Sequence, residues 1–205
     1  LKMAKQEFGI PVITEIMEEK YLDLICETTD ILQIGSRNMQ NFPLLTECAK
    51  SGKPIMLKRH YGSSLRDWLG AAEYLLVEGN KKVILCERGT FFGYNDLIVD
   101  PRNLVWLKSE TNKVSMDITH CLQQPSQKMA DGTVKSGGLR ELIPYMGKMA
   151  IALDVDGIFM EVHPDPNNAL SDGPNMVPLN KLRLLLEQLI SIRNSLSENL
   201  PTSDI

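Results

Sequence analysis

Residues 83–88 are VILCER, four apolar residues that end abruptly in glutamate and arginine. The same pattern, an apolar and β-branched run that ends in a charged or polar residue, occurs five more times: VITE at 12–15, ILQIGSR at 31–37, IMLKR at 55–59, VSMDITH at 114–120 and IFMEVH at 158–163. Runs without in-and-out alternation are typical of parallel strands covered on both faces, and each is followed by a stretch of helical length. The sequence therefore predicts a repeated strand-helix unit.

This repeat favours an α/β fold of the (β/α)8 TIM-barrel type. Six of the eight units are recognisable after an opening helical stretch at 1–8, and a closed barrel typically needs about 250 residues, whereas this chain has 205. We therefore expect one barrel domain at 1–196 whose first two strands are missing through N-terminal truncation, followed by a disordered tail at 197–205. A barrel without those strands is expected to be inactive on its own.

Composition excludes several classes of protein. The chain is 43% hydrophobic without a long apolar run, and its formal charge is −4, so neither a membrane span nor a nucleic-acid-binding surface is expected. The four cysteines show no C-x-x-C spacing and lie in or beside apolar segments, which indicates reduced thiols in a cytoplasmic protein.

The segments between the strands predict helices and one long loop. We expect a helix at 17–28 with Met17, Tyr21, Leu24 and Ile25 on one face, a helix from Pro43 to Ser51-Gly52, a helix capped by Ser64 with Trp68 in the core, a short helix at 103–109, and an amphipathic helix at 179–196. Residues 121–138 are expected to form a loop that acts as a mobile lid.

Charged side chains end the predicted strands and should gather at one end of the barrel, where the loops after the strands build active sites. Lys58 and Arg88 end two successive strands, and Arg37 lies just past a third. A guanidinium binds phosphate or carboxylate oxygens in a bidentate manner, and an ammonium supplies a compact charge, so the three could hold a phosphorylated anion. Alternatively, they form structural ion pairs with Glu15, Glu87 or Asp117.

A second group contains one imidazole and two carboxylates, His120, Glu161 and Asp172. These residues could bind a divalent cation such as Mn, Fe, Zn or Mg, with a fourth ligand from elsewhere. They could equally act as acid and base on a bound water without metal.

Long motifs carry a resemblance to a known family. The segments ERG at 87–89, MEVHPDP at 160–166 and ALSDGP at 169–174 resemble the barrel family of 3-deoxy-arabino-heptulosonate 7-phosphate (DAHP) and 3-deoxy-octulosonate 8-phosphate (KDO 8-phosphate) synthases. FGYNDLIVD at 92–100, THCLQQP at 119–125 and SGGLRE at 136–141 resemble the octulosonate branch. TEIM at 14–17, GSRNMQNF at 35–42 and LKR at 57–59 resemble the heptulosonate branch. The strand-end loops and the long lid favour the octulosonate branch.

The resemblance implies a transferase that condenses phosphoenolpyruvate with arabinose 5-phosphate and water, with loss of phosphate by C–O cleavage. The product would be 3-deoxy-D-manno-octulosonate 8-phosphate, used for lipopolysaccharide. The alternatives are use of erythrose 4-phosphate, as in DAHP synthases, and a non-catalytic barrel that retains only anion binding. A metal hydrolase is disfavoured because three cations exceed what water activation needs.

The resemblance also implies roles for individual residues. Lys58 and Arg88 would bind phosphoenolpyruvate with help from Arg37, and His120, Glu161 and Asp172 would be metal ligands, so that the catalytic set is His120, Lys58, Glu161 and Asp172. The sugar phosphate would meet Asn95, Gln123, Ser136 and Arg140. The family's fourth metal ligand, cysteine or asparagine, belongs to the absent first strand, and Gly173-Pro174 resembles the metal-independent form, which needs no cofactor. The family is usually tetrameric, so a homotetramer is expected.

Overall fold

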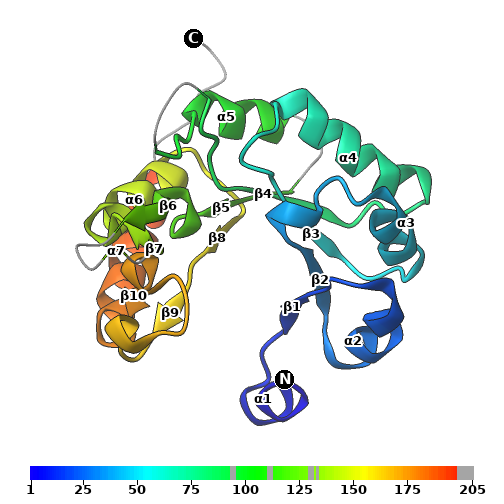
Figure 1. Cartoon of the computed structure of the whole chain (residues 1–205), viewed down its shortest axis with the longest axis horizontal. Coiled ribbons are helices and arrows are strands. Elements are labelled where there is room, and N and C mark those ends of the chain that lie inside the picture. The colour runs from blue at the N-terminus through cyan, green and yellow to red at the C-terminus, as the bar shows by residue number, and fades with distance from the viewer. Residues whose placement is uncertain (93–95, 110–112, 129–131, 133, 198–205) are drawn as a thin grey trace.

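The computed structural model describes residues 1–92, 96–109, 113–128, 132 and 134–197. Its centre is a curved sheet of six parallel strands in the order β1-β2-β3-β4-β5-β8 (Figure 1). The strands are β1 (Ile13–Glu15), β2 (Ile31–Ile34), β3 (Ile55–Lys58), β4 (Val83–Glu87), β5 (Lys113–Asp117) and β8 (Gly157–Phe159). The prediction of a TIM barrel with six of its eight strand-helix units is confirmed, and β1 and β8 form the two edges of the described sheet.

Helices lie along the outer side of the curved sheet (Figure 1). They are α1 (Lys2–Phe8), α2 (Leu22–Thr28), α3 (Phe42–Lys50), α4 (Leu65–Val77), α5 (Pro101–Ser109), α6 (Ile143–Ala152) and α7 (Leu179–Ser197). One hydrophobic core joins helices α2 through α7 to the sheet, with fully buried side chains such as Trp68, Leu75 and Leu85, whereas α1 has no buried residue. None of the described helices combines the length and the apolar character needed to cross a bilayer.

Local signals explain where the helices begin. Ser64 caps α4 in a capping box: its hydroxyl accepts the Asp67 N–H, and the Asp67 carboxylate accepts the Ser64 N–H. Asn41 caps α3, and Pro43 stands in its first turn. The predicted start of α4 and the burial of Trp68 are confirmed, whereas α3 begins at Phe42, one residue before the predicted Pro43.

The predicted helical face at 17–28 is wrong for Met17, Tyr21 and Leu24 and confirmed for Ile25. A 3-10 turn, η1 (Glu19–Tyr21), precedes α2 and shifts the register, so Met17, Tyr21 and Leu24 are exposed. The side chains that pack on the core are Leu22, Ile25 and Cys26. A change from three to 3.6 residues per turn rotates the apolar stripe, which explains the error.

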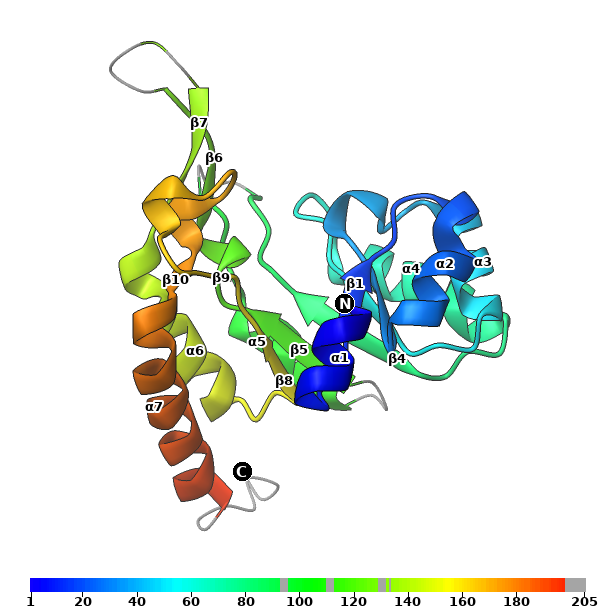
Figure 2. The same cartoon turned by 90° about the horizontal axis from the view of Figure 1, so that it is seen from below.

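The segment predicted as a loop at 121–138 contains a β-hairpin. Its strands, β6 (Gln123–Lys128) and β7 (Val134–Gly138), pair antiparallel, and the hairpin projects from the rest of the molecule (Figure 2). The register shifts between Gln124 and Gln127, around Pro125, which has no N–H to donate. Polar strands without apolar alternation give no strand signal in the sequence, so the hairpin was missed.

Short elements follow the strand ends and carry the polar residues. After β5 comes η3 (His120–Leu122), and after the hairpin comes η4 (Arg140–Leu142). The run predicted as one strand at 158–163 is divided into β8 and β9 (Val162–His163), and β9 pairs with β10 (Val177–Pro178) in a separate small sheet. Between them lie η5 (Pro166–Asn168) and η6 (Gly173–Asn175), whereas η2 (Ser36–Asn38) follows β2.

Two further expectations concern the cysteines and the C-terminal end. All four cysteines are free; Cys26 is half-buried and Cys48, Cys86 and Cys121 are buried, and burial raises the pKa of Cys86 to about 12. Helix α7 extends to Ser197, one residue beyond the predicted end, and the rest of the expected disordered tail, 198–205, lies outside the described residues.

We expect Leu75→Ala to lower the free energy of unfolding by roughly 2–5 kcal/mol, because Leu75 is fully buried in α4 and the truncation leaves a cavity. The adjacent Leu76 is 43% exposed, so Leu76→Ala should change it by no more than about 0.5 kcal/mol. Urea denaturation of both variants checks this, and equal losses would contradict the assigned core.

Candidate active site

The carboxylate of Asp117, at the end of β5, is the centre of the site and is 0% exposed. Its Oδ2 accepts from Lys58 Nζ at 2.6 Å and from His120 Nδ1 at 2.7 Å. Its Oδ1 accepts the backbone N–H groups of Thr119 at 3.0 Å and His120 at 2.8 Å. One carboxylate therefore fixes both the side chain and the backbone of His120 and also holds Lys58.

Asp117 is held in its charged form. Burial raises its pKa, but the hydrogen bond from His120 and the charges of His120 and Lys58 outweigh burial and hold the pKa well below its usual range. Lys58 is itself buried, and its ammonium lies 3.7 Å from the centre of the Phe159 ring. The ammonium is thus fixed by an ion pair on one side and an aromatic face on the other.

His120 lies between two carboxylates. Its Nε2 is 3.3 Å from Glu161 Oε1, on the side opposite Asp117. Burial lowers its pKa, but hydrogen bonds to Asp117 and Glu161 outweigh burial and raise the pKa of His120 to about 9. At neutral pH and without a bound cation, the imidazole is therefore protonated on both nitrogens and positively charged.

The structure brings together the three residues predicted as metal ligands. One ligand atom from each of His120, Glu161 and Asp172 lies within 4.8 Å of the others. Glu161 Oε2 is buried and has no hydrogen-bond partner, so it is an acceptor available to a cation. Asp172 has a left-handed backbone, with φ 52°, at the start of η6. Mixed nitrogen and oxygen donors of this kind fit a divalent ion.

Arg88 is joined to this cluster through Gln123. One terminal nitrogen of Arg88 donates to the His120 carbonyl at 3.1 Å and to Gln123 Oε1 at 3.1 Å. The amide nitrogen of Gln123 donates in turn to Asp172 Oδ1 at 2.5 Å. Arg88 Nε is buried without a partner, and burial lowers the pKa of Arg88. A buried N–H without an acceptor is a donor ready for an anionic ligand.

The other predicted ligand residues lie farther from the centre or outside the described part. Arg37, in η2, is exposed, and its charge lowers the pKa of Arg88. Arg140 donates to the Gly173 carbonyl and lines a cavity of about 560 Å³ between α6 and α7. The side chain of Ser136, in β7, and the whole of Asn95 lie outside the described residues.

Sequence reasoning considered ion pairing as an alternative to anion binding, and the structure shows ion pairs. Lys58 pairs with Asp117, whereas Glu87 pairs with Arg59 rather than with Arg88. The organising role of Asp117 and the Arg59–Glu87 pair were not foreseen. The available signal was position, because these acidic residues end strands β5 and β4 beside the predicted cations.

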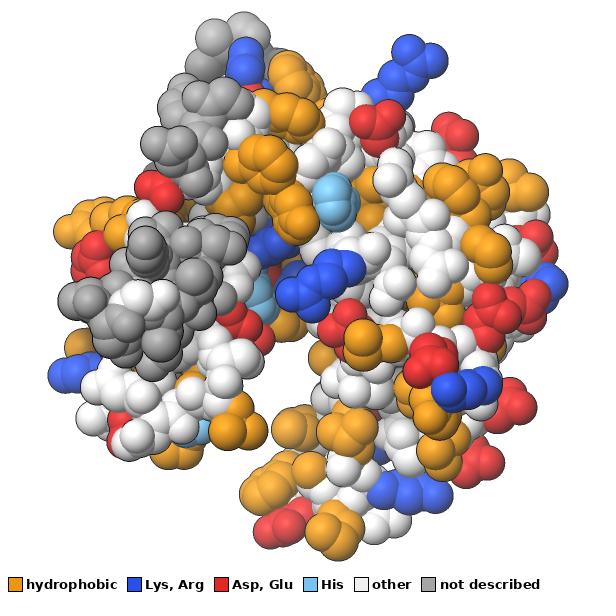
Figure 3. Space-filling view, viewed as in Figure 1, with side chains coloured by type: hydrophobic (Ala, Val, Ile, Leu, Met, Phe, Trp, Pro, Cys, Tyr) orange, Lys and Arg blue, Asp and Glu red, His pale blue; other side chains and the backbone are white. Residues whose placement is uncertain are grey.

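The face at the carboxyl ends of the strands is hollowed. Figure 3 shows basic, acidic and histidine side chains around and inside this hollow, with apolar side chains at its rim. The arrangement of a fixed ammonium, an available guanidinium N–H and a carboxylate-flanked imidazole can neutralise an anion and hold a proton beside it.

The chain is similar to known proteins over nearly its whole length. The sequence profile described as the DAHP synthetase I family matches residues 1–198. The 2-dehydro-3-deoxyphosphooctonate aldolase 2 of Arabidopsis thaliana is 47% identical over 193 residues, which cover 94% of this chain and 66% of that protein. The 2-dehydro-3-deoxyphosphooctonate aldolase of Hydrogenovibrio crunogenus is 38% identical over 189 residues, covering 92% of this chain and 67% of that one.

A solved structure is also similar. The DAHP synthase (phospho-2-dehydro-3-deoxyheptonate aldolase) of Thermotoga maritima superposes with a TM-score of 0.83 at 33% identity, covering 95% of this chain and 54% of that chain. The chain thus spans about two thirds of the length of its curated relatives.

We expect Asp117→Asn to lower the pKa of His120 by roughly 1 to 3 pH units, because it removes the opposite charge but keeps the side-chain shape. In the parent chain the folded pKa of about 9 exceeds the ordinary 6.5, so protonation of His120 stabilises the fold fully below pH 6.5. This contribution is lost as the pH rises through 9. Imidazole NMR titration and urea denaturation, both with chelator present, measure the two effects.

Asp156→Asn is the matched control, since Asp156 also accepts a backbone N–H of β5, that of Val114. It should leave the His120 titration unchanged. A His120 pKa that stays near 9 in Asp117→Asn would contradict the assigned pairing.

Proposed function

The chain belongs to the DAHP synthetase I family, and from this membership we propose that the protein condenses phosphoenolpyruvate with arabinose 5-phosphate and water. The products are 3-deoxy-D-manno-octulosonate 8-phosphate and inorganic phosphate. The observation that supports this chemistry is that Lys58, Arg88 and His120 converge on one hollow. Asp117 holds Lys58 and His120, and the His120 carbonyl accepts a hydrogen bond from Arg88. The choice of sugar is supported by the names of relatives that are 36–47% identical.

In this proposal the cations hold phosphoenolpyruvate. Lys58 and the unpartnered Nε of Arg88 bind its phosphate and carboxylate, with Arg37 assisting from the exposed rim. Fixed cations in a buried site stabilise negative charge more strongly than in water, and they need no reorganisation during the reaction. The sugar phosphate meets Gln123 and Arg140, together with Asn95 and Ser136.

The bonds change in a balanced way. C3 of phosphoenolpyruvate forms a bond to the aldehyde carbon, and water adds to C2 and loses its first proton. The C2–O bond to phosphate then breaks, the added oxygen becomes the C2 ketone, and its second proton leaves with the phosphate. His120 holds the proton that the aldehyde oxygen takes up, and Glu161, with its unpartnered Oε2, accepts the proton that the water loses. Asp117 keeps the imidazole oriented through both steps.

His120, Glu161 and Asp172 would hold a divalent ion (Mn, Fe, Zn or Mg) in a metal-dependent form of the enzyme. Such an ion would supply Lewis-acid polarisation of a bound oxygen. We also propose a cytoplasmic location, which the four free cysteines support, and a homotetramer, by analogy with the family.

The second candidate is condensation with erythrose 4-phosphate, which the 33% identical DAHP synthase structure favours. We expect phosphate release from phosphoenolpyruvate by the full-length protein to depend on arabinose 5-phosphate and not on erythrose 4-phosphate. Preference for the four-carbon sugar would establish the second candidate, and binding of phosphoenolpyruvate without turnover would indicate an anion-binding protein.

Within that assay, Arg88→Met should lower kcat/KM by roughly 100-fold or more, the usual effect of removing one preorganised donor. Arg102→Met is the matched control, since Arg102 is 72% exposed and pairs with Asp100 on the surface. Its rate should equal that of the parent protein.

We expect Mn²⁺ to bind more tightly as the pH rises, by up to about tenfold per pH unit below 9, because the ion competes with the His120 proton. Asp172→Asn should weaken binding, whereas Asp165→Asn, which alters a nearby carboxylate outside the cluster, should not. Calorimetric titration measures both. Binding that is unaffected by Asp172→Asn would exclude this site, and no binding would indicate a metal-independent enzyme.

A further inference from the structure

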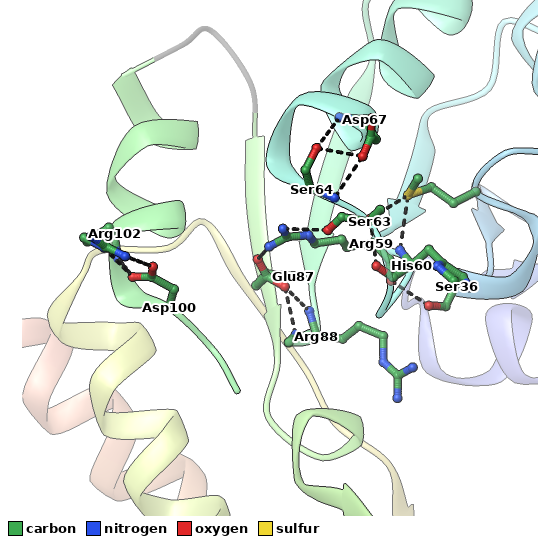
Figure 4. Close-up of polar contacts among 12 residues, drawn as sticks. Ser36, Arg59, His60, Ser63, Ser64, Asp67, Glu87, Arg88, Asp100 and Arg102 are labelled. Atoms are coloured by element: carbon green, nitrogen blue, oxygen red, sulfur yellow. Dashed lines mark hydrogen bonds and ion pairs between the residues drawn. The ribbon is translucent and has the colours of Figure 1, made fainter. Parts of the chain in front are cut away.

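A buried ion pair lies directly behind the two cations of the site. Arg59 NH1 donates to Glu87 Oε2 at 2.7 Å, and the two side chains are 5% and 0% exposed (Figure 4). Arg59 follows Lys58 in the sequence, and Glu87 precedes Arg88. Because β3 and β4 are neighbouring parallel strands, the pair connects their carboxyl ends at the point where both cations emerge.

The second oxygen of Glu87 binds the backbone that carries Arg88. Glu87 Oε1 accepts the N–H of Arg88 at 2.9 Å and the N–H of Gly89 at 2.8 Å. Gly89 has φ +82°, a conformation suited to glycine, and a Cβ at this position would lie 3.2 Å from the Ile98 carbonyl oxygen. The carboxylate therefore fixes the turn after β4 with one oxygen and the guanidinium of Arg59 with the other.

Arg59 fixes the loop after β3 in the same way. Its NH2 donates to the Ser63 carbonyl at 2.9 Å, and its own carbonyl accepts from Ser36 Oγ, in η2, at 2.6 Å. The guanidinium lies 5.8 Å from the ring centre of Trp68. The loops after three successive strands, β2, β3 and β4, are thereby tied to one buried pair.

The pair also keeps Glu87 from competing for Arg88. Figure 4 shows the Arg88 side chain extending away from Glu87, and its terminal nitrogen instead donates to the His120 carbonyl and Gln123. An unpaired buried carboxylate one residue away would attract that guanidinium strongly. With Arg59 bound to Glu87, the guanidinium of Arg88 stays directed toward the hollow.

We propose that Arg59 and Glu87 are positioning residues, which set the backbone and the direction of Lys58 and Arg88 for binding of phosphoenolpyruvate without touching it. This inference rests on the proposed function of those two cations. It distinguishes Arg59 from an anion-attracting charge, because both terminal nitrogens of its guanidinium donate within the protein, NH1 to Glu87 and NH2 to Ser63, and only its buried Nε has no partner.

The test is calorimetric titration of phosphoenolpyruvate into the full-length protein and its variants. Glu87→Gln and Arg59→Met should each raise the Kd at least tenfold. The double variant should raise it no more than the more damaging single variant, because both changes break one connection. The direction in which Glu87→Gln changes the Kd is decisive. This substitution makes the site more positive, so a purely electrostatic role would lower the Kd, whereas a positioning role raises it.

Leu75→Ala is the stability control. It weakens the core without touching the three loops, so its Kd should stay within about twofold of the parent value. If a single variant fails to fold, the double variant carries the test, because it leaves no unpaired buried charge. It should still show the tenfold rise, because the tie between Glu87 and Arg59 is absent.

Three results would overturn the proposal. The first is a Kd that is unchanged in every folded variant, and the second is additive effects in the double variant. The third is a loss of affinity in Leu75→Ala equal to that in Glu87→Gln. If the parent protein does not bind phosphoenolpyruvate, the proposed function fails together with this inference, which distinguishes that case from the other three.

Discussion

The burial of Asp117 is the constraint on which the rest of the site depends. A carboxylate that is 0% exposed is tolerable only when its charge is balanced and its oxygens are fully bonded, and Lys58, His120 and two backbone N–H groups provide this. The same bonds also fix the ammonium of Lys58 and the imidazole of His120, which face the hollow. Glu161 and Asp172 then gather around His120, and Arg88 reaches the cluster through Gln123.

The parallel sheet makes this concentration of charge possible. Neighbouring strands end at the same edge, so residues that are 30 positions apart, such as Lys58 and Arg88, arrive side by side. Two of the cations pair with acidic residues at nearby strand ends: Lys58, at the end of β3, pairs with Asp117 on β5, the next strand but one, and Arg59 pairs with Glu87 on the adjoining β4. A buried pair adds little net stability, whereas loss of one partner costs roughly 3–5 kcal/mol. These pairs therefore act chiefly on geometry, and the Nε of Arg88, which is buried without a partner, remains an unused donor in the group that joins Arg88 to His120 and Gln123.

Much of this could be predicted from the sequence, and the failures have physical causes. The six strands of the sheet and the cap at Ser64 depend on local composition, which the sequence shows directly. The grouping of His120, Glu161 and Asp172 followed from their places at strand ends or in the following loop, and the resemblance to a family then implied their role as metal ligands; Asp172 itself has φ 52°, which no periodicity predicts. The Lys58–Asp117 pair was anticipated as the alternative to anion binding. The hairpin was missed because its strands are polar, and the Arg59–Glu87 pair was missed because side-chain pairing across strands depends on register, which one sequence does not reveal.

The formal charges of the site show what else it needs. Lys58, Arg88 and protonated His120 contribute three positive charges, and Asp117, Glu161 and Asp172 contribute three negative charges, so the cluster is neutral as it stands. A neutral site attracts a phosphorylated carboxylate only through directed hydrogen bonds such as the one that Arg88 Nε can donate. Exchange of the His120 proton for a divalent cation would raise the total by one, and Arg37 at the rim adds another. The same three ligands can therefore serve a metal-dependent or a metal-independent site, and the difference lies in how much of the anion's charge must be balanced by fixed donors.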